Sequence, residues 1–70
     1  MLKLKINGKE NEFSNEKFPQ TLAVLLDSLK IDRQTVVAEV NANIIERKDF
    51  EATKLNEDDS IELIRFVGGG

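Results

Sequence analysis

The chain has 70 residues, a formal charge of −3, no cysteine and no histidine. A chain of this length forms one small domain, and its weakly acidic charge argues against a nucleic-acid partner, which requires a basic surface. No apolar run approaches the roughly 20 residues that span a bilayer, and the amino-terminal residues lack the apolar stretch of a signal peptide. We therefore expect a cytoplasmic protein with no membrane partner.

The first residues predict a β-hairpin. Every second residue is apolar, namely Leu2, Leu4 and Ile6. This alternation is typical of a strand with one buried face, and the Asn7-Gly8 pair that follows favours a tight hairpin turn. The polar segment 9–13 is then expected to return along the edge of the sheet. Residues 14–17 are polar and are followed by Phe18 and Pro19, so segment 14–19 predicts a loop.

A helix is predicted next, because four leucines recur at a helical spacing: Leu22, Leu25, Leu26 and Leu29. Positions i, i+3, i+4 and i+7 form one stripe, so we expect all four side chains to face the core. Thr21 precedes this stripe and is the expected N-cap, since its hydroxyl can accept a hydrogen bond from a first-turn amide.

The remaining chain reads mainly as strands. Residues 35–40 are rich in β-branched side chains, and a turn at 41–43 leads into a short strand around Ile44 and Ile45. Segment 46–55 has no clear periodicity and is expected to be a loop with one helical turn near Asp49. Residues 60–67 form the last predicted strand. One helix laid on one face of a mixed sheet of about five strands is an α+β, two-layer domain.

Alternation in the last strand predicts an apolar surface on the face that no helix covers. If Ile61 and Leu63 point toward the helix, Ile64 and Phe66 point away from it. Val37 extends this surface if its strand turns three other residues toward the core: Val36, Ala38 and Val40. Exposed apolar side chains of this kind indicate a partner-binding surface. The alternative is a kink near Arg65 that returns Phe66 to the core.

The sequence offers little catalytic chemistry. Without histidine or cysteine it lacks the commonest general base and the thiol nucleophile. The densest acidic cluster, at 57–59, lies in a predicted exposed turn with no apolar wall to shift a pKa. Arg47 is interpreted as solvated or paired with a nearby carboxylate. We expect no enzymatic activity, no metal site and no bound cofactor.

The chain ends with Gly68, Gly69 and Gly70. Glycines after the last strand predict a domain over residues 1–67 followed by a flexible tail at 68–70. Three residues without Cβ atoms could pass extended through a narrow channel and reach about 10 Å into a partner's active site. A frayed end without function is the alternative.

Three segments resemble the ThiS family, the sulfur carriers of thiamine biosynthesis, which share the ubiquitin-like β-grasp fold. The segments are TLAVLLDSL, VVAEVNANIIERKDF and LNEDDSIELIRFVGGG. The residues that fit the family pattern are Asn41, Arg47, Asp59, Ile61, Glu62, Gly69 and Gly70. Two residues depart from it, because Glu46 stands where proline is usual and Asp58 where glycine is usual.

The resemblance implies a mechanism. A ThiF-like adenylyltransferase uses ATP to adenylate Gly70, a cysteine desulfurase pathway supplies sulfur, and a ThiG-like thiazole synthase consumes the resulting thiocarboxylate. The small subunit of molybdopterin synthase is a second interpretation, although those chains carry a Pro-Pro-Val-like segment where this one has Arg65-Phe66-Val67. A ubiquitin-like conjugation or interaction module is a third interpretation, and a structural domain with an inert tail is a fourth.

Overall fold

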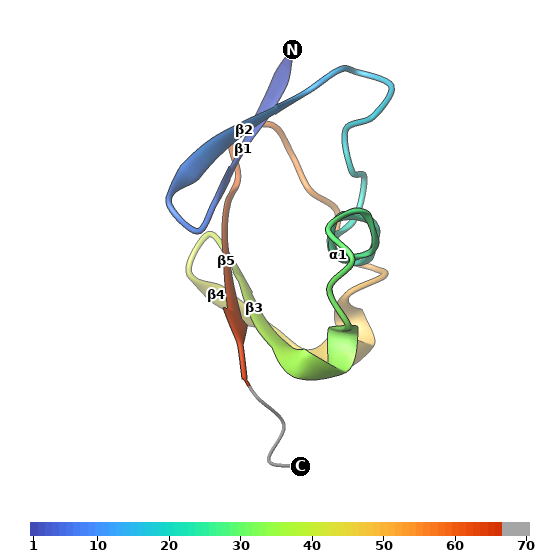
Figure 1. The fold of residues 1–70 in the computed structure, drawn as a ribbon, viewed down its shortest axis with the longest axis vertical. Coiled ribbons are helices and arrows are strands. Elements are labelled where there is room, and N and C mark those ends of the chain that lie inside the picture. The colour runs from blue at the N-terminus through green and yellow to red at the C-terminus, as the bar shows by residue number, and fades with distance from the viewer. Residues whose placement is uncertain (67–70) are drawn as a thin grey trace.

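A mixed five-stranded sheet and one α-helix form two layers over residues 1–66, the part of the chain that this computed structural model describes (Figure 1). In chain order the elements are β1 (Leu2–Ile6), β2 (Lys9–Phe13), α1 (Leu22–Ser28), the 3-10 turn η1 (Arg33–Thr35), β3 (Val36–Val40), β4 (Asn43–Ile45), the 3-10 turn η2 (Arg47–Asp49) and β5 (Ser60–Arg65). The strand order is β2-β1-β5-β3-β4; β1 and β5 are parallel, and the other neighbours are antiparallel. The predicted α+β architecture is confirmed. No helix in this described part is long and apolar enough to cross a membrane.

The amino-terminal hairpin forms as its sequence predicts. Asn7 and Gly8 both have positive φ, 50° and 81°, which the tight turn between β1 and β2 requires. The side-chain Oδ1 of Asn7 also accepts a hydrogen bond of 2.7 Å from the backbone N–H of Leu63. Because β1 ends at Ile6, this side chain satisfies a donor of β5 that β1 does not reach. The turn thus fixes β1 against the last strand.

Helix α1 begins as predicted and ends earlier than predicted. The hydroxyl of Thr21 accepts a hydrogen bond of 3.2 Å from Val24 N–H, which confirms the N-cap. Leu29 lies outside the helix and is 43% exposed, so the expectation that it faces the core is wrong. The chain reverses at Lys30, whose φ is 59°, and Ile31 N–H donates to the carbonyl of Leu26. This is a Schellman ending, in which Ile31 packs against the core in place of Leu29.

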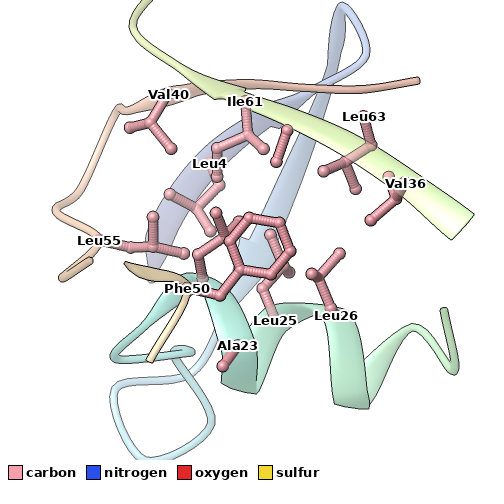
Figure 2. Close-up of a cluster of buried hydrophobic side chains, with 12 residues drawn as sticks. Leu4, Ala23, Leu25, Leu26, Val36, Val40, Phe50, Leu55, Ile61 and Leu63 are labelled. Carbon is pink, nitrogen blue, oxygen red and sulfur yellow. The ribbon is translucent and has the colours of Figure 1, made fainter. Parts of the chain in front are cut away.

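The core lies between α1 and the sheet and contains two large residues that the sequence pattern did not single out. Phe50 is 1% exposed and Leu55 is 5% exposed. Figure 2 shows the Phe50 ring between the helix and the strands, close to Leu25. The helical turn expected near Asp49 is present as η2, but the segment around it is not a simple loop. Its backbone is hydrogen-bonded to the start of α1, because Leu22 N–H donates to the Thr53 carbonyl and Ala23 N–H donates to the Phe50 carbonyl.

The turn between β3 and β4 holds an alanine in a conformation that favours glycine. Asn41 and Ala42 have φ values of 51° and 71°, as a two-residue hairpin loop requires. A Cβ atom is unfavourable in this left-handed region, whereas glycine adopts it readily. We expect Ala42→Gly to raise the free energy of unfolding by about 0.5–1 kcal/mol, measured by urea denaturation.

Ala52→Gly is the matched control for this substitution. Ala52 is also exposed, but its φ is not positive, so glycine there only adds freedom to the unfolded chain. It should lower stability slightly. Equal losses of stability in the two variants would contradict the interpretation of the turn.

Candidate functional site

The face of the sheet opposite α1 carries the predicted apolar surface. Val37 of β3 pairs with Ile64 of β5, and their side chains are 38% and 54% exposed. The alternate positions of both strands are buried, namely Val36, Ala38, Val40, Ile61 and Leu63. The predicted orientation of both strands is therefore confirmed.

Phe66 directly follows β5 and is 46% exposed. The alternative in which a kink returns it to the core is wrong. The last strand also ends at Arg65, before the predicted residue 67, and β3 begins at Val36 because Thr35 belongs to η1. One more backbone hydrogen bond nevertheless joins the two chain segments beyond the ends of β5 and β3, because Phe66 N–H donates to the Thr35 carbonyl at 3.0 Å. This bond fixes the position at which the chain leaves the sheet.

Ile44 is the residue of this surface that the sequence analysis missed. It is 69% exposed and pairs with Glu39, which lies on the same face of β3 as Val37. The two-residue turn at 41–42 sets this register, so counting back from the turn could have placed Ile44 outward and Ile45 inward. Ile44, Val37 and Phe66 line one shallow depression of about 300 Å³. We call the four exposed residues the outer apolar patch: Val37, Ile44, Ile64 and Phe66.

Asn41 and Asp59, which both fit the family pattern, stabilise the turn before β5 through hydrogen bonds. The side-chain amide of Asn41 donates to Asp59 Oδ1 at 2.9 Å, and its Oδ1 accepts from Ser60 N–H at 2.9 Å. Asp59 Oδ2 in turn accepts from Asn56 N–H at 2.7 Å. Asn41 and Asp59 thus position the start of β5 and have no catalytic geometry.

The two departures from the sequence pattern are compatible with the local backbone. Asp58, where glycine is usual, has φ of 71°, and aspartate is among the residues that tolerate this region. Glu46, where proline is usual, has φ of −73°, close to the value that a proline ring imposes. Both residues therefore fit the backbone conformation at their positions.

Only some of the charged groups of residues 1–66 form ion pairs. The Nη1 atom of Arg33 lies 2.9 Å from Glu51 Oε2, and its Nη2 atom lies 3.3 Å from Asp27 Oδ2. The hydrogen bond with Glu51 is the main cause that raises the pKa of the Arg33 guanidinium, and the charge of Asp27 raises this pKa to a smaller extent. Arg47 is exposed and forms no ion pair within this part of the chain. In the same part, no three acidic side chains lie together in a way that could hold a metal ion.

The predicted tail lies outside the described residues, which end at Phe66. The expectations for Gly68, Gly69 and Gly70, and the domain boundary at residue 67, stay predictions. The structure does show where β5 ends, at the end of the molecule opposite the amino terminus and next to the outer apolar patch (Figure 1).

Known proteins similar to this chain cover it almost completely. The model of the ThiS family matches residues 4–70. The sulfur carrier protein ThiS of Bacillus subtilis is 34% identical over 67 residues, which are 96% of this chain and 98% of that protein. A thiazole synthase of Paramagnetospirillum magneticum is 35% identical over 69 residues, but the chain spans only 20% of its length.

A solved structure gives the same result for the fold. The crystal structure of the thiamine biosynthesis protein ThiS from Geobacter metallireducens superimposes with a TM-score of 0.82 and 31% identity, covering 99% of this chain and all of that one. The five-stranded mixed sheet with one helix is therefore the β-grasp fold of that protein. The chain belongs to the ThiS family, whose small proteins carry sulfur for thiamine biosynthesis and are not enzymes themselves.

Proposed function

We propose that the chain carries sulfur as a thiocarboxylate on Gly70. The observation that supports this most strongly is the match to the family model, which extends through the terminal glycines. An ionised carboxylate is a poor electrophile, so it must be activated first. A carboxylate oxygen attacks the α-phosphorus of ATP and pyrophosphate leaves. A sulfide-level sulfur then attacks the carbonyl carbon, AMP leaves with the original oxygen, and the thiocarboxylate remains.

The chemical steps belong to partners in this proposal. A ThiF-like adenylyltransferase binds and uses the ATP, while the carrier binds no cofactor. A cysteine desulfurase pathway in the cytoplasm supplies persulfide sulfur, and a thiol reductant supplies the two electrons that bring this sulfur to the sulfide level. The absence of histidine and cysteine agrees with this division of labour, since the chain has neither the usual base nor a thiol nucleophile.

A ThiG-like thiazole synthase is the proposed acceptor of the sulfur. Thiazole synthases of Paramagnetospirillum magneticum and Magnetococcus marinus each contain a region that is 35% identical to 99% of this chain. The presence of such a region within one polypeptide that is named a thiazole synthase supports direct contact between the two proteins. The docking surface would be the outer apolar patch, in which Phe66, Ile64 and Val37 were predicted from sequence and Ile44 comes from the structure.

Intact-mass measurement tests the proposed function. The 70-residue protein is incubated with ATP, a ThiF-like enzyme and sodium sulfide, and a mass gain equal to replacement of one oxygen by sulfur is expected. Without sulfide, the acyl-adenylate mass should appear, and without ATP the mass should stay unchanged. High-mass adducts to lysines would instead support a conjugation module, and an unchanged mass under complete conditions would contradict the proposal.

The acceptor is tested with the thiocarboxylated product. Transfer of its sulfur in the presence of thiazole synthase, with return of the carboxylate mass, is the expected result. Transfer only to a molybdopterin synthase large subunit would assign the chain to the second interpretation.

A further inference from the structure

Two glutamates lie side by side on the face that carries the outer apolar patch. Glu39 of β3 pairs with Glu62 of β5, and the next pair on the same face is Val37 with Ile64. The acidic pair therefore adjoins the apolar pair along the same two strands. Glu62 is exposed, whereas Glu39 is partly buried.

Within the described residues, no cation is bonded to this pair. The ion pairs of residues 1–66 involve neither Glu39 nor Glu62. On the β4 side, the neighbour of Glu39 is Ile44, which has no charge. On the β1 side, Lys3 binds Glu10 at 3.8 Å, and Lys5 forms no ion pair with Glu62. Like charges directly opposite each other on adjacent strands destabilise a sheet.

A partner that covers the patch would strengthen the repulsion between Glu39 and Glu62 unless this partner supplies a positive charge. A protein that packs on Val37 and Ile64 also removes water from the adjoining carboxylates. A carboxylate that loses its water without gaining a cation is strongly unfavourable, and two adjacent carboxylates more so. A guanidinium group fits this place best, because its planar fork can donate to two neighbouring carboxylates at once.

We infer that the thiazole synthase that docks on the outer apolar patch presents an arginine side chain to Glu39 and Glu62. This inference rests on the proposed function, because it takes the patch as the docking surface for thiazole synthase. It adds the chemistry that the partner must bring, namely an apolar contact centre with an arginine at its border. The unpaired glutamates then select against partners that are neutral or acidic at this place.

The test compares two double variants that change the net charge equally. Glu39→Gln/Glu62→Gln removes the acidic pair, while Glu12→Gln/Glu57→Gln removes two exposed carboxylates from β2 and from the turn before β5. We measure the affinity for thiazole synthase over a range of salt concentrations. The Glu39/Glu62 variant should bind it about tenfold more weakly and lose most of the salt dependence.

The urea midpoint is a second measurement, and it should rise while the affinity falls. Removing the repulsion should raise the urea midpoint of the Glu39/Glu62 variant, so weaker binding cannot be attributed to unfolding. An affinity for thiazole synthase equal to that of the control variant would overturn the inference. If Phe66→Ala also leaves this affinity unchanged, the patch is not the docking surface and the inference fails with it. The mass assay on the unaltered chain reports separately on thiocarboxylate formation.

Discussion

Deletion of Gly70 is expected to abolish thiocarboxylate formation and to leave the thermal unfolding midpoint almost unchanged. The shortened chain still ends in a carboxylate, but that group lies one residue, about 3.3–3.6 Å, short of its place in the activating enzyme. Attack on the α-phosphorus depends on close positioning, and misplacement by about 1 Å already costs around 100-fold in rate. Intact mass after incubation with ATP, the enzyme and sulfide measures the result.

The stability part of this prediction follows from the fold. The buried core of the described residues lies within residues 1–66, and glycine has no side chain with which to join it. Gly70→Ala is the length-matched control, because it keeps the carboxylate in place and should retain measurable activity. A Gly70 deletion that accepts sulfur at the rate of the unaltered chain would contradict the proposed role of Gly70.

Replacement of Phe66 by alanine should weaken binding to the ThiF-like enzyme about tenfold or more, with a loss of roughly 1 kcal/mol or less in unfolding free energy. Large aromatic side chains at interface centres often contribute 2 kcal/mol or more to binding, whereas substitutions of exposed residues have small effects on stability. Phe66 is 46% exposed and lies beside the strand end from which the tail continues. Affinity and the urea midpoint are measured on the same preparation.

Phe50→Ala is the contrasting variant. Phe50 is 1% exposed in the centre of the core, so its truncation should cost about 3–5 kcal/mol, which is close to the whole stability of a domain this small. Phe50→Leu retains part of the volume and allows a midpoint to be measured. If Phe66→Ala melts as early as the Phe50 variants and binds normally when folded, the docking role of Phe66 is wrong.

Much of the site could be predicted from short-range patterns. The strand period of two places Val37 and Ile64 on the face opposite Val36 and Leu63, and this needs no knowledge of distant contacts. The Asn7-Gly8 turn likewise determines how β2 returns along β1. Such features are encoded by neighbouring residues, and they were confirmed.

The errors concern features that depend on distant parts of the chain or on backbone geometry. Phe50 and Leu55 enter the core because their segment is bonded to the start of α1, a contact that local periodicity cannot reveal. Leu29 continues the leucine spacing, but the reversal at Lys30 ends the helix before it. Ile44 was missed because a strand of three residues shows too little alternation to indicate which face is covered.

The parallel pairing of β1 with β5 has a consequence for the synthesis of the protein. These neighbouring strands lie far apart along the chain, with Lys5 beside Ser60, and β3 packs on the other side of β5. The sheet therefore stays open until the last strand has left the ribosome, and such distant pairings also slow folding. A nascent chain that lacks β5 has neither a closed core nor half of the apolar patch. If the patch is the docking surface, as we propose, partner recognition is restricted to chains that have been translated through the strand leading to the proposed sulfur-carrying glycine.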